Sequence, residues 1–267
     1  MTFALTDCSR LFWLKHTMAS TSASGDADGP VDMAGIIRLF KQGEAVDSMM
    51  KMIADSDQEA LTEVKPDGTS LLQSFTVVGN YDIVKALWSK GARPSILQAD
   101  QSTILHSAVR TQDDTQDGVR SQILQLFFSS EKHGTDLKGS INLQNNKGWT
   151  SLKLAARKNL EHCVEVLLEN EADPDIPDQE HFTALHNAIG FPAILKLLLT
   201  KTKNINCQNS DGETPLFLAS ERGLTESALT LLEYDADPNI PNKEGMCTCI
   251  VYPKNVFWYC FLGYNLN

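Results

Sequence analysis

Two short motifs in the chain contain residue types that could perform covalent or metal chemistry. Ser48-Met49-Met50-Lys51 fits the S-x-x-K pattern of serine acylases, but the companion S-D-N and K-T-G motifs are missing, and the four residues also suit one face of a helix. Asp113 to Gly118 has the acid and glycine spacing with which a calcium loop begins. The twelfth position of that loop must be a bidentate glutamate, and here it is Leu124. Neither motif predicts a site.

Histidine and cysteine are metal ligands and nucleophiles by type. His181 and His186 lie near Cys163 and Cys207 in the sequence, but their spacing matches no zinc-binding pattern. Phosphate-binding glycine loops, G-x-S-x-G and H-E-x-x-H are absent from the chain. We therefore expect no catalytic residues, no metal and no cofactor, and the chain is predicted not to be an enzyme.

The elements that must position any functional side chain repeat at an interval near 33 residues. The turn residue of each unit falls at 68, 101, 148, 181, 212 and 245, which gives intervals of 33, 47, 33, 31 and 33. The 47-residue interval exceeds 33 by 14 residues, which fall around 113–117 and 132–138 and are predicted to be mobile. The interval of 31 reflects a shorter turn at 190–192. Length differences therefore fall between the predicted helices and not inside them.

Each unit carries the signals of two short helices. Thr150, Thr183 and Thr214 stand where a hydroxyl can cap the start of the first helix. Large and then small apolar residues follow on one face, as in Leu216-Phe217-Leu218-Ala219, so neighbouring helices can approach closely. A second apolar segment such as 194–199 precedes a proline-containing exit. One unit cannot bury its apolar face alone, so we expect the units to stack.

These units resemble ankyrin repeats, whose hallmark is T-P-L-H-x-A in a 33-residue helix–turn–helix unit. Thr214-Pro215-Leu216-Phe217-Leu218-Ala219 matches it with Phe217 in place of histidine, and Thr183-Ala184-Leu185-His186-Asn187-Ala188 lacks only the proline. The first two units match loosely, since Gln73 replaces the histidine and Phe75 fills a position reserved for alanine. The resemblance covers roughly residues 66–245 and implies an all-α ankyrin-repeat solenoid with protruding hairpin loops. It also implies that His106 and His186 hydrogen-bond between neighbouring loops.

The predicted domain organisation follows from the positions of these units. Residues 1–30 form a disordered N-terminal segment and linker, and residues 31–65 form a helical N-terminal cap. The repeat domain spans 66–245, with units near 66–98, 99–145, 146–178, 179–209 and 210–242. Residues 246–267 form an atypical aromatic tail. Two hypotheses remain open for it, an unusual C-terminal cap or a sixth repeat interrupted by unrelated coding sequence.

Composition limits the partner class and the compartment. The 267 residues include 34 acidic and 23 basic side chains, a formal net charge of −11, which argues against nucleic acid as the main partner. The six cysteines are scattered, as in a reduced intracellular protein. The chain shows neither a signal peptide nor a membrane span. We expect a monomer in the cytoplasm or the nucleus, with no membrane partner.

The remaining candidate for function is a surface. In ankyrin repeats, partners dock on the groove formed by the hairpin tips and the first helices, so the resemblance implies a role for residues there. Trp149 and Phe182 are predicted to stand on adjacent hairpin tips as apolar anchors. Charged residues along the same groove are predicted to set the register of the partner: Arg110, Arg157, Lys158, Glu213, Glu221 and Arg222. The alternatives are that both aromatic rings lean onto their own hairpins and that the charges are only solvated.

The sequence thus predicts a non-enzymatic interaction module or scaffold that binds a protein partner on its concave groove. One alternative is the substrate-recognition arm of a larger enzyme, such as a ubiquitin ligase, whose catalytic module lies beyond this chain. Another is the cytosolic repeat region of a membrane channel.

Overall fold

The computed structural model describes residues 46–55, 61, 69–93, 98–110, 117–129 and 134–248. Every element longer than one residue in these ranges is an α-helix, which confirms the all-α prediction. The chain divides into two compact units, Met1–Gln98 and Ala99–Asn267. The predicted disordered segment, most of the predicted cap and residues 249–267 of the aromatic tail lie outside the described residues.

The first unit contains helices α3 (Val46–Asp55), α5 (Leu71–Val78) and α6 (Tyr81–Ser89). Helix α5 begins with a capping box, in which the backbone N–H of Gln73 donates to the Ser70 hydroxyl and the Ser70 N–H donates to the Gln73 side chain. Helices α5 and α6 form a hairpin, and α3 packs on α6. The S-x-x-K motif lies inside α3, and its Lys51 is exposed.

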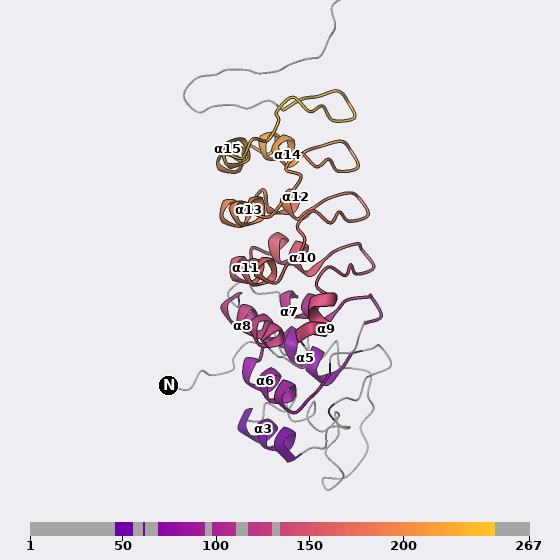
Figure 1. Cartoon of the computed structure of the whole chain (residues 1–267), viewed down its shortest axis with the longest axis vertical. Helices are drawn as coiled ribbons and strands as arrows, with labels where there is room; N and C mark the ends of the chain where they lie inside the picture. The colour runs from indigo at the N-terminus through magenta and orange to yellow at the C-terminus, as the bar shows by residue number, and fades with distance from the viewer. Residues whose placement is uncertain are drawn as a thin grey trace, which may run out of the picture. The chain divides into compact units, whose positions relative to one another are not determined.

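The second unit is a stack of four helix pairs (Figure 1). The pairs are α7 (Ile104–Val109) with α8 (Asp117–Phe128), α10 (Ser151–Arg157) with α11 (Glu161–Glu169), α12 (Ala184–Ala188) with α13 (Pro192–Leu199), and α14 (Pro215–Glu221) with α15 (Thr225–Glu233). First helices contact first helices, in the order α7, α10, α12 and α14, and second helices contact second helices in the same way. Hairpin loops project from one side of the stack, beside the row of first helices.

Capping and burial explain why these short helices form. The hydroxyl of Thr150 accepts from the N–H of Lys153 at 3.2 Å, and that of Thr214 accepts from the N–H of Phe217 at 3.1 Å, which confirms two of the three predicted caps. Thr183 stands at the N-cap of α12, but its hydroxyl pairs with the His186 ring at 3.0 Å. The small residues of the repeat face are fully buried, as in Ala188, and so are the leucines that precede them. Helices of five to nine residues are marginal in isolation, so the stack stabilises them through packing.

The longest repeat of the second unit contains an additional helix, α9 (Gly134–Gly139), which packs on α8. It covers part of the sequence that was predicted to be mobile, while residues 111–116 and 130–133 lie outside the described residues. Each helix of the described ranges is too short or too polar to cross a membrane.

Candidate partner-binding surface

One polar side chain organises each of the last four hairpin tips of the second unit. Its Oδ1 accepts the backbone N–H groups two and four residues later, at 2.9 to 3.1 Å. The four residues at this position are Asn145, Asp178, Asn209 and Asn242. The last of them closes a hairpin in register for a sixth repeat, whose continuation lies outside the described residues. These bonds fix the backbone of the tips and therefore the directions in which their side chains leave it.

Neighbouring hairpins are also bonded to one another. The amide of Gln144 donates to the carbonyl oxygens of Gly148, at 2.7 Å, and of Pro177, at 2.8 Å, on the next hairpin. Gln208 repeats this arrangement with Gly212 and Pro241. Between these two pairs, the Ser210 N–H donates to the Glu180 carbonyl oxygen at 2.9 Å. The tips therefore form a continuous, hydrogen-bonded row, so that neighbouring side chains are presented in a fixed register.

The hallmark histidines connect the first helices to this row. In His186, Nδ1 accepts the backbone N–H of Thr183 at 3.1 Å, and Nε2 donates to the carbonyl oxygen of Glu213 on the next hairpin at 3.2 Å. His106 bonds the N–H of Thr103 and the carbonyl of Trp149 in the same way. The prediction of loop-to-loop hydrogen bonds from these two histidines is confirmed.

Both histidines are neutral in this arrangement, because one ring nitrogen must accept and the other must donate. Burial lowers the pKa of His186 to about 4, against the opposing effect of its bond to the Glu213 carbonyl. Burial likewise lowers the pKa of His106. The rings are structural links and not acid–base groups near neutral pH.

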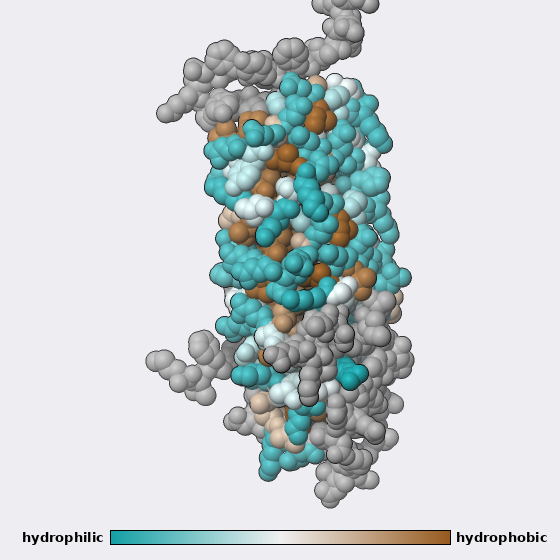
Figure 2. All heavy atoms as spheres, in the orientation of Figure 1, coloured by the Kyte–Doolittle hydropathy of each residue, from teal (hydrophilic) through white to brown (hydrophobic). Residues whose placement is uncertain are grey.

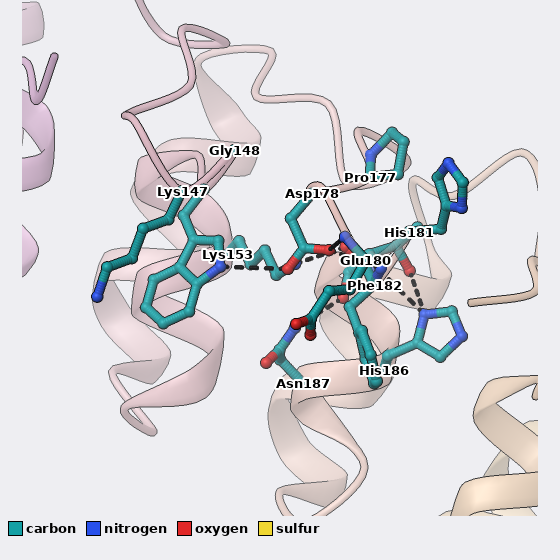
Figure 3. Close-up of polar contacts among 12 residues, drawn as sticks. Lys147, Gly148, Lys153, Pro177, Asp178, Glu180, His181, Phe182, His186 and Asn187 are labelled. Carbon is teal, nitrogen blue, oxygen red and sulfur yellow. Dashed lines mark hydrogen bonds and ion pairs between the residues drawn. The ribbon is translucent and has the colours of Figure 1, made fainter. Parts of the chain in front are cut away.

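Lys153 occupies the hallmark histidine position between them in sequence. Its Nζ donates to the carbonyl oxygen of Phe182 at 2.5 Å, the same carbonyl position that His106 and His186 reach on their own next hairpins. The ammonium also forms an ion pair with Asp178, and the two side chains are only 3% and 8% exposed. Figure 3 shows Lys153 reaching from its helix to Asp178 on the neighbouring hairpin.

The surroundings of this ion pair lower the pKa of both groups. Burial lowers the pKa of Lys153, while the hydrogen bond and the charge of Asp178 oppose that shift. Burial would raise the pKa of Asp178, but Lys153 and the backbone N–H groups of Phe182 and Glu180 hold it below its usual value. A buried pair with this many hydrogen bonds is a fixed part of the scaffold.

Trp149 is half-buried, and its side chain reaches from its own hairpin to the next one. Its indole N–H donates to Oδ2 of Asp178 at 3.2 Å. The ammonium of Lys147 lies 5.4 Å from the ring centroid and the guanidinium carbon of Arg157 lies 4.7 Å from it, both within cation–π range. The ring therefore bonds to the next hairpin, which differs from the alternative that it leans only on its own.

Phe182 is half-buried on the next tip. Its ring meets the ring of His186 edge-on, with centroids 5.4 Å apart and planes at 69°. The ammonium of Lys153 lies 6.0 Å from the Phe182 centroid. Trp149 and Phe182 are thus linked through the Lys153–Asp178 pair and lie on successive, mutually fixed hairpins.

The other predicted site residues have various surroundings. Arg110 is exposed and forms an ion pair with Asp100 at 3.0 Å. Glu213 is half-buried, and its carboxylate accepts from the Asn209 amide at 2.8 Å. Lys158 is half-buried at the C-cap of α10. Glu221 ends α14, Arg222 is its C-cap, and both are exposed. The structure brings Trp149, Phe182 and Arg157 together, and the remaining residues are spread along the stack.

Sequence reasoning missed Lys147, Lys153 and Asp178. A signal for the last two was present in the sequence. Alignment of the units places Lys153 in the column of His106 and His186, and Asp178 in the column of Asn145 and Asn209. A lysine at the histidine position of one unit, together with an aspartate at the asparagine position of the next hairpin, indicates a charge pair.

The described residues contain few groups suited to metal binding or to nucleophilic catalysis. They contain no group of three or more His, Cys, Asp or Glu side chains placed to hold a metal ion. Burial raises the pKa of the Cys163 thiol, and it raises that of Cys207 to about 11. Thiols with raised pKa values are poor nucleophiles.

Comparison with known proteins supports the resemblance seen in the sequence. A family model of ankyrin repeats in three copies matches residues 118–209 and, overlapping them, 172–242. A structure of the ankyrin repeat domain of Bcl-3, described as a unique member of the IkappaB protein family, superposes with a TM-score of 0.63 at 25% identity, covering 82% of this chain and 92% of that one. The chain belongs to the ankyrin repeat family.

Two relatives show how the chain compares with longer proteins. The nuclear factor NF-kappa-B p105 subunit of Gallus gallus is 26% identical over 235 residues, which cover 86% of this chain. The transient receptor potential cation channel subfamily A member 1 of Homo sapiens is 25% identical over 201 residues, which cover 72% of this chain. The chain spans only 22% and 17% of these two proteins, respectively.

Proposed function

We propose that the chain is a non-enzymatic protein-interaction module that binds a protein partner along the hairpin tips and first helices of its second unit. The observation that carries the proposal is the fixed row of tips, in which Trp149 and Phe182 are held on successive hairpins by the Lys153–Asp178 pair. A surface that is already ordered loses little conformational entropy on binding, which favours affinity. Arg157 supplies a positive charge at the Trp149 ring, and the other proposed charged residues lie along the stack: Arg110, Lys158, Glu213, Glu221 and Arg222.

Similarity and charge support the same proposal. The family match and the similarity to the p105 subunit and to the ankyrin repeat domain of Bcl-3 support the partner-docking groove that the ankyrin resemblance implies. The net charge of −11 disfavours nucleic acid as the partner. We place the chain in the cytoplasm or the nucleus as a monomer, and the p105 relative, a nuclear factor by name, agrees with that location.

The first experiment locates the interface in cells. A photo-reactive phenylalanine analogue is introduced at Phe182, and at the exposed Lys196 on helix α13 as a matched control. We expect a cross-linked protein from position 182 and none from position 196. Equal cross-linking from both positions would exclude the hairpin surface as the specific interface.

A second experiment tests the two aromatic anchors. With the photo-reactive group at position 213, the variant carrying Trp149→Ala and Phe182→Ala should lose the cross-linked protein while its helical circular dichroism stays intact. Retention of that protein at the wild-type level would remove both residues from the interface.

A second candidate function is the repeat region of a larger membrane channel. The match to the human cation channel over 72% of this chain favours it. Full-length transcript sequencing tests this candidate. A membrane-spanning segment in the same reading frame would support it, and a complete transcript without one would exclude it.

A further inference from the structure

The surroundings of Trp149 indicate what kind of partner group this surface binds. Lys147 and Arg157 both approach its ring, and both are exposed. Ion pairs among the described residues involve Arg110, Lys153 and His162, and neither Lys147 nor Arg157 takes part in one. Two cations gathered on one aromatic ring without a carboxylate partner are unusual in a protein whose net charge is −11.

The buried pair beneath the ring does not neutralise these two cations. Lys153 and Asp178 cancel one another's charge, and the Asp178 carboxylate already accepts from Lys153, from Trp149 and from two backbone N–H groups. The other acidic group whose charge acts on Lys153 is Glu180, which is exposed. Lys147 and Arg157 therefore lie at the ring as two exposed cations, and the Asp178 carboxylate next to it is already occupied.

Apolar residues form only part of the surface that a partner would contact. Hydrophilic residues cover most of the visible face of the second unit, with apolar residues showing between them (Figure 2). The large apolar side chains that are exposed among the described residues are Val119, Leu143, Tyr234 and Met246. Trp149 and Phe182 are only half-buried, so a partner can reach the rings and the cations together.

We propose that Lys147, Trp149 and Arg157 form a subsite for the carboxylates of an acidic peptide segment of the partner, and that Lys153 and Asp178 are its positioning residues. The inference rests on the proposed interaction function and specifies the chemistry of the partner. The guanidinium of Arg157 offers a planar set of N–H donors that matches a carboxylate, and Lys147 adds a second positive charge. Asp178 holds the indole through its N–H, so the ring that supports both cations stays in place.

The test uses a hexaglutamate peptide with the full chain, and hexaglutamine as the neutral control peptide. Binding is followed through the indole N–H resonances of the four tryptophans, in which Trp149 is assigned by its loss in Trp149→Phe. Hexaglutamate should shift the Trp149 resonance and hexaglutamine should not, and the affinity should fall as salt is raised. No shift of this resonance by hexaglutamate overturns the subsite.

Matched variants separate a specific subsite from a general effect of charge. Lys147→Gln with Arg157→Gln should weaken hexaglutamate binding at least fivefold. Lys196→Gln with Lys201→Gln removes the same charge from exposed residues at α13 and after it, and should leave the affinity unchanged. Equal weakening in both double variants overturns the proposal, because it shows only the loss of overall positive charge.

A third variant tests the positioning role without changing the local charge. Lys153→His with Asp178→Asn replaces the ion pair with the neutral residues used by His186 and Asn209, and it removes the acceptor of the Trp149 N–H. We expect this variant to keep its helical circular dichroism and to bind hexaglutamate several-fold more weakly. Unchanged affinity would show that Asp178 does not position the ring.

These outcomes are independent of the interaction function itself. If hexaglutamate fails to bind while the protein cross-linked from position 182 is retained, the acidic subsite is wrong and the interaction module stands. If the cross-linked protein is absent as well, the proposed function is wrong too.

Discussion

Two neighbouring junctions of the second unit make the same inter-repeat bond with different chemistry. Where α12 meets the following hairpin, His186 donates to the Glu213 carbonyl and Asn209 organises the tip. Where α10 meets its following hairpin, Lys153 donates to the Phe182 carbonyl and Asp178 organises the tip. An ammonium can therefore replace an imidazole in this position when the next hairpin exchanges its amide for a carboxylate.

The exchange of a histidine and an asparagine for a lysine and an aspartate also changes which side chain is held at the surface. The second oxygen of Asp178, Oδ2, accepts both from the Lys153 ammonium and from the indole N–H of Trp149. Asn209 uses its amide nitrogen to donate to the Glu213 carboxylate instead. The charged junction thus fixes an aromatic ring at the surface, whereas the neutral junction fixes an acidic side chain. The difference shows how one scaffold bond can also determine which functional group is presented.

The largest expected effect is the loss of one partner of the charged junction. Lys153→Ala leaves Asp178 without its cation, and we expect the free energy of unfolding to fall by about 3–5 kcal/mol. His186→Ala at the neutral junction should cost less, about 1–3 kcal/mol, because only neutral groups lose their bonds. Urea denaturation followed by circular dichroism at pH 7 measures both. Equal losses would contradict the distinction between the two junctions.

The exchange of both residues is the control for that prediction. Lys153→His with Asp178→Asn should recover most of the stability that either single substitution loses, because it rebuilds the neutral arrangement. A double variant as unstable as the sum of the single variants would show that the two residues are not coupled.

The second prediction is that the free energy of unfolding depends on pH differently at the two junctions. An unfolded histidine binds a proton below a pKa of about 6.5, whereas folded His186 does so only near its pKa of about 4. Between these values the unfolded chain binds more protons, so stability falls as the pH falls through this window, on the order of 3 kcal/mol for His186. At the charged junction the pKa of Asp178 is held below its usual value, so the contribution of that carboxylate is lost only at a lower pH than this window.

His186→Gln is the matched variant for this prediction, because Gln73 forms a capping box from the same position of α5. The variant should lose stability less steeply than the wild type between pH 6.5 and pH 4, as measured by urea denaturation at each pH. A parallel pH dependence in both proteins would show that His186 is not the group that titrates.

The smallest expected effect concerns the turn residue of each hairpin. Gly148 has a φ of +74°, and a Cβ there would lie 3.0 Å from the backbone nitrogen of Gln179 on the next hairpin. Gly148→Ala should therefore lower the free energy of unfolding by about 1–3 kcal/mol. His181 holds the same position at the other junction with a φ of 59° and already carries a Cβ.

His181→Ala provides the comparison for that substitution. It should change the stability by less than about 0.5 kcal/mol, since His181 is exposed and its backbone strain is already present. Thermal denaturation of both variants checks the order. A larger effect for His181→Ala would mean that its 3.4 Å contact with Ser210 stabilises the stack more than the hairpin spacing does.

Much of the repeat chemistry could be predicted from the sequence. Thr150 and Thr214 predicted two helix starts, because a hydroxyl before an apolar face is a local capping signal. His106 and His186 predicted bonds between loops through the family resemblance. Helix α9 was not anticipated, because a six-residue segment with glycine at each end carries no clear helix signal.

The position of the candidate site was predicted only in part. Trp149 and Phe182 were placed on adjacent tips from their register, and their role in binding remains a prediction. The sequence also grouped Arg110 and Glu213 with them, although each has its own partner within the stack. These partners lie ten and four residues away in the chain, and they meet because the chain folds back at the hairpin, which the repeat register alone does not show.

The sequence alone determined the repeat interval, the all-α class and the two columns in which Lys153 and Asp178 stand. Those features are local, because periodicity, caps and turns involve residues a few positions apart. Only the tertiary structure decided that Lys153, Asp178 and Trp149 meet, and that Lys147 and Arg157 approach the same ring. The physical reason is that Asp178 lies 25 residues from Lys153 and 29 from Trp149 in the chain, and stacking of the repeats brings them within bonding distance. Lys147 and Arg157 lie in the same repeat as Trp149, and the fold of that hairpin and of α10 places both cations on the ring.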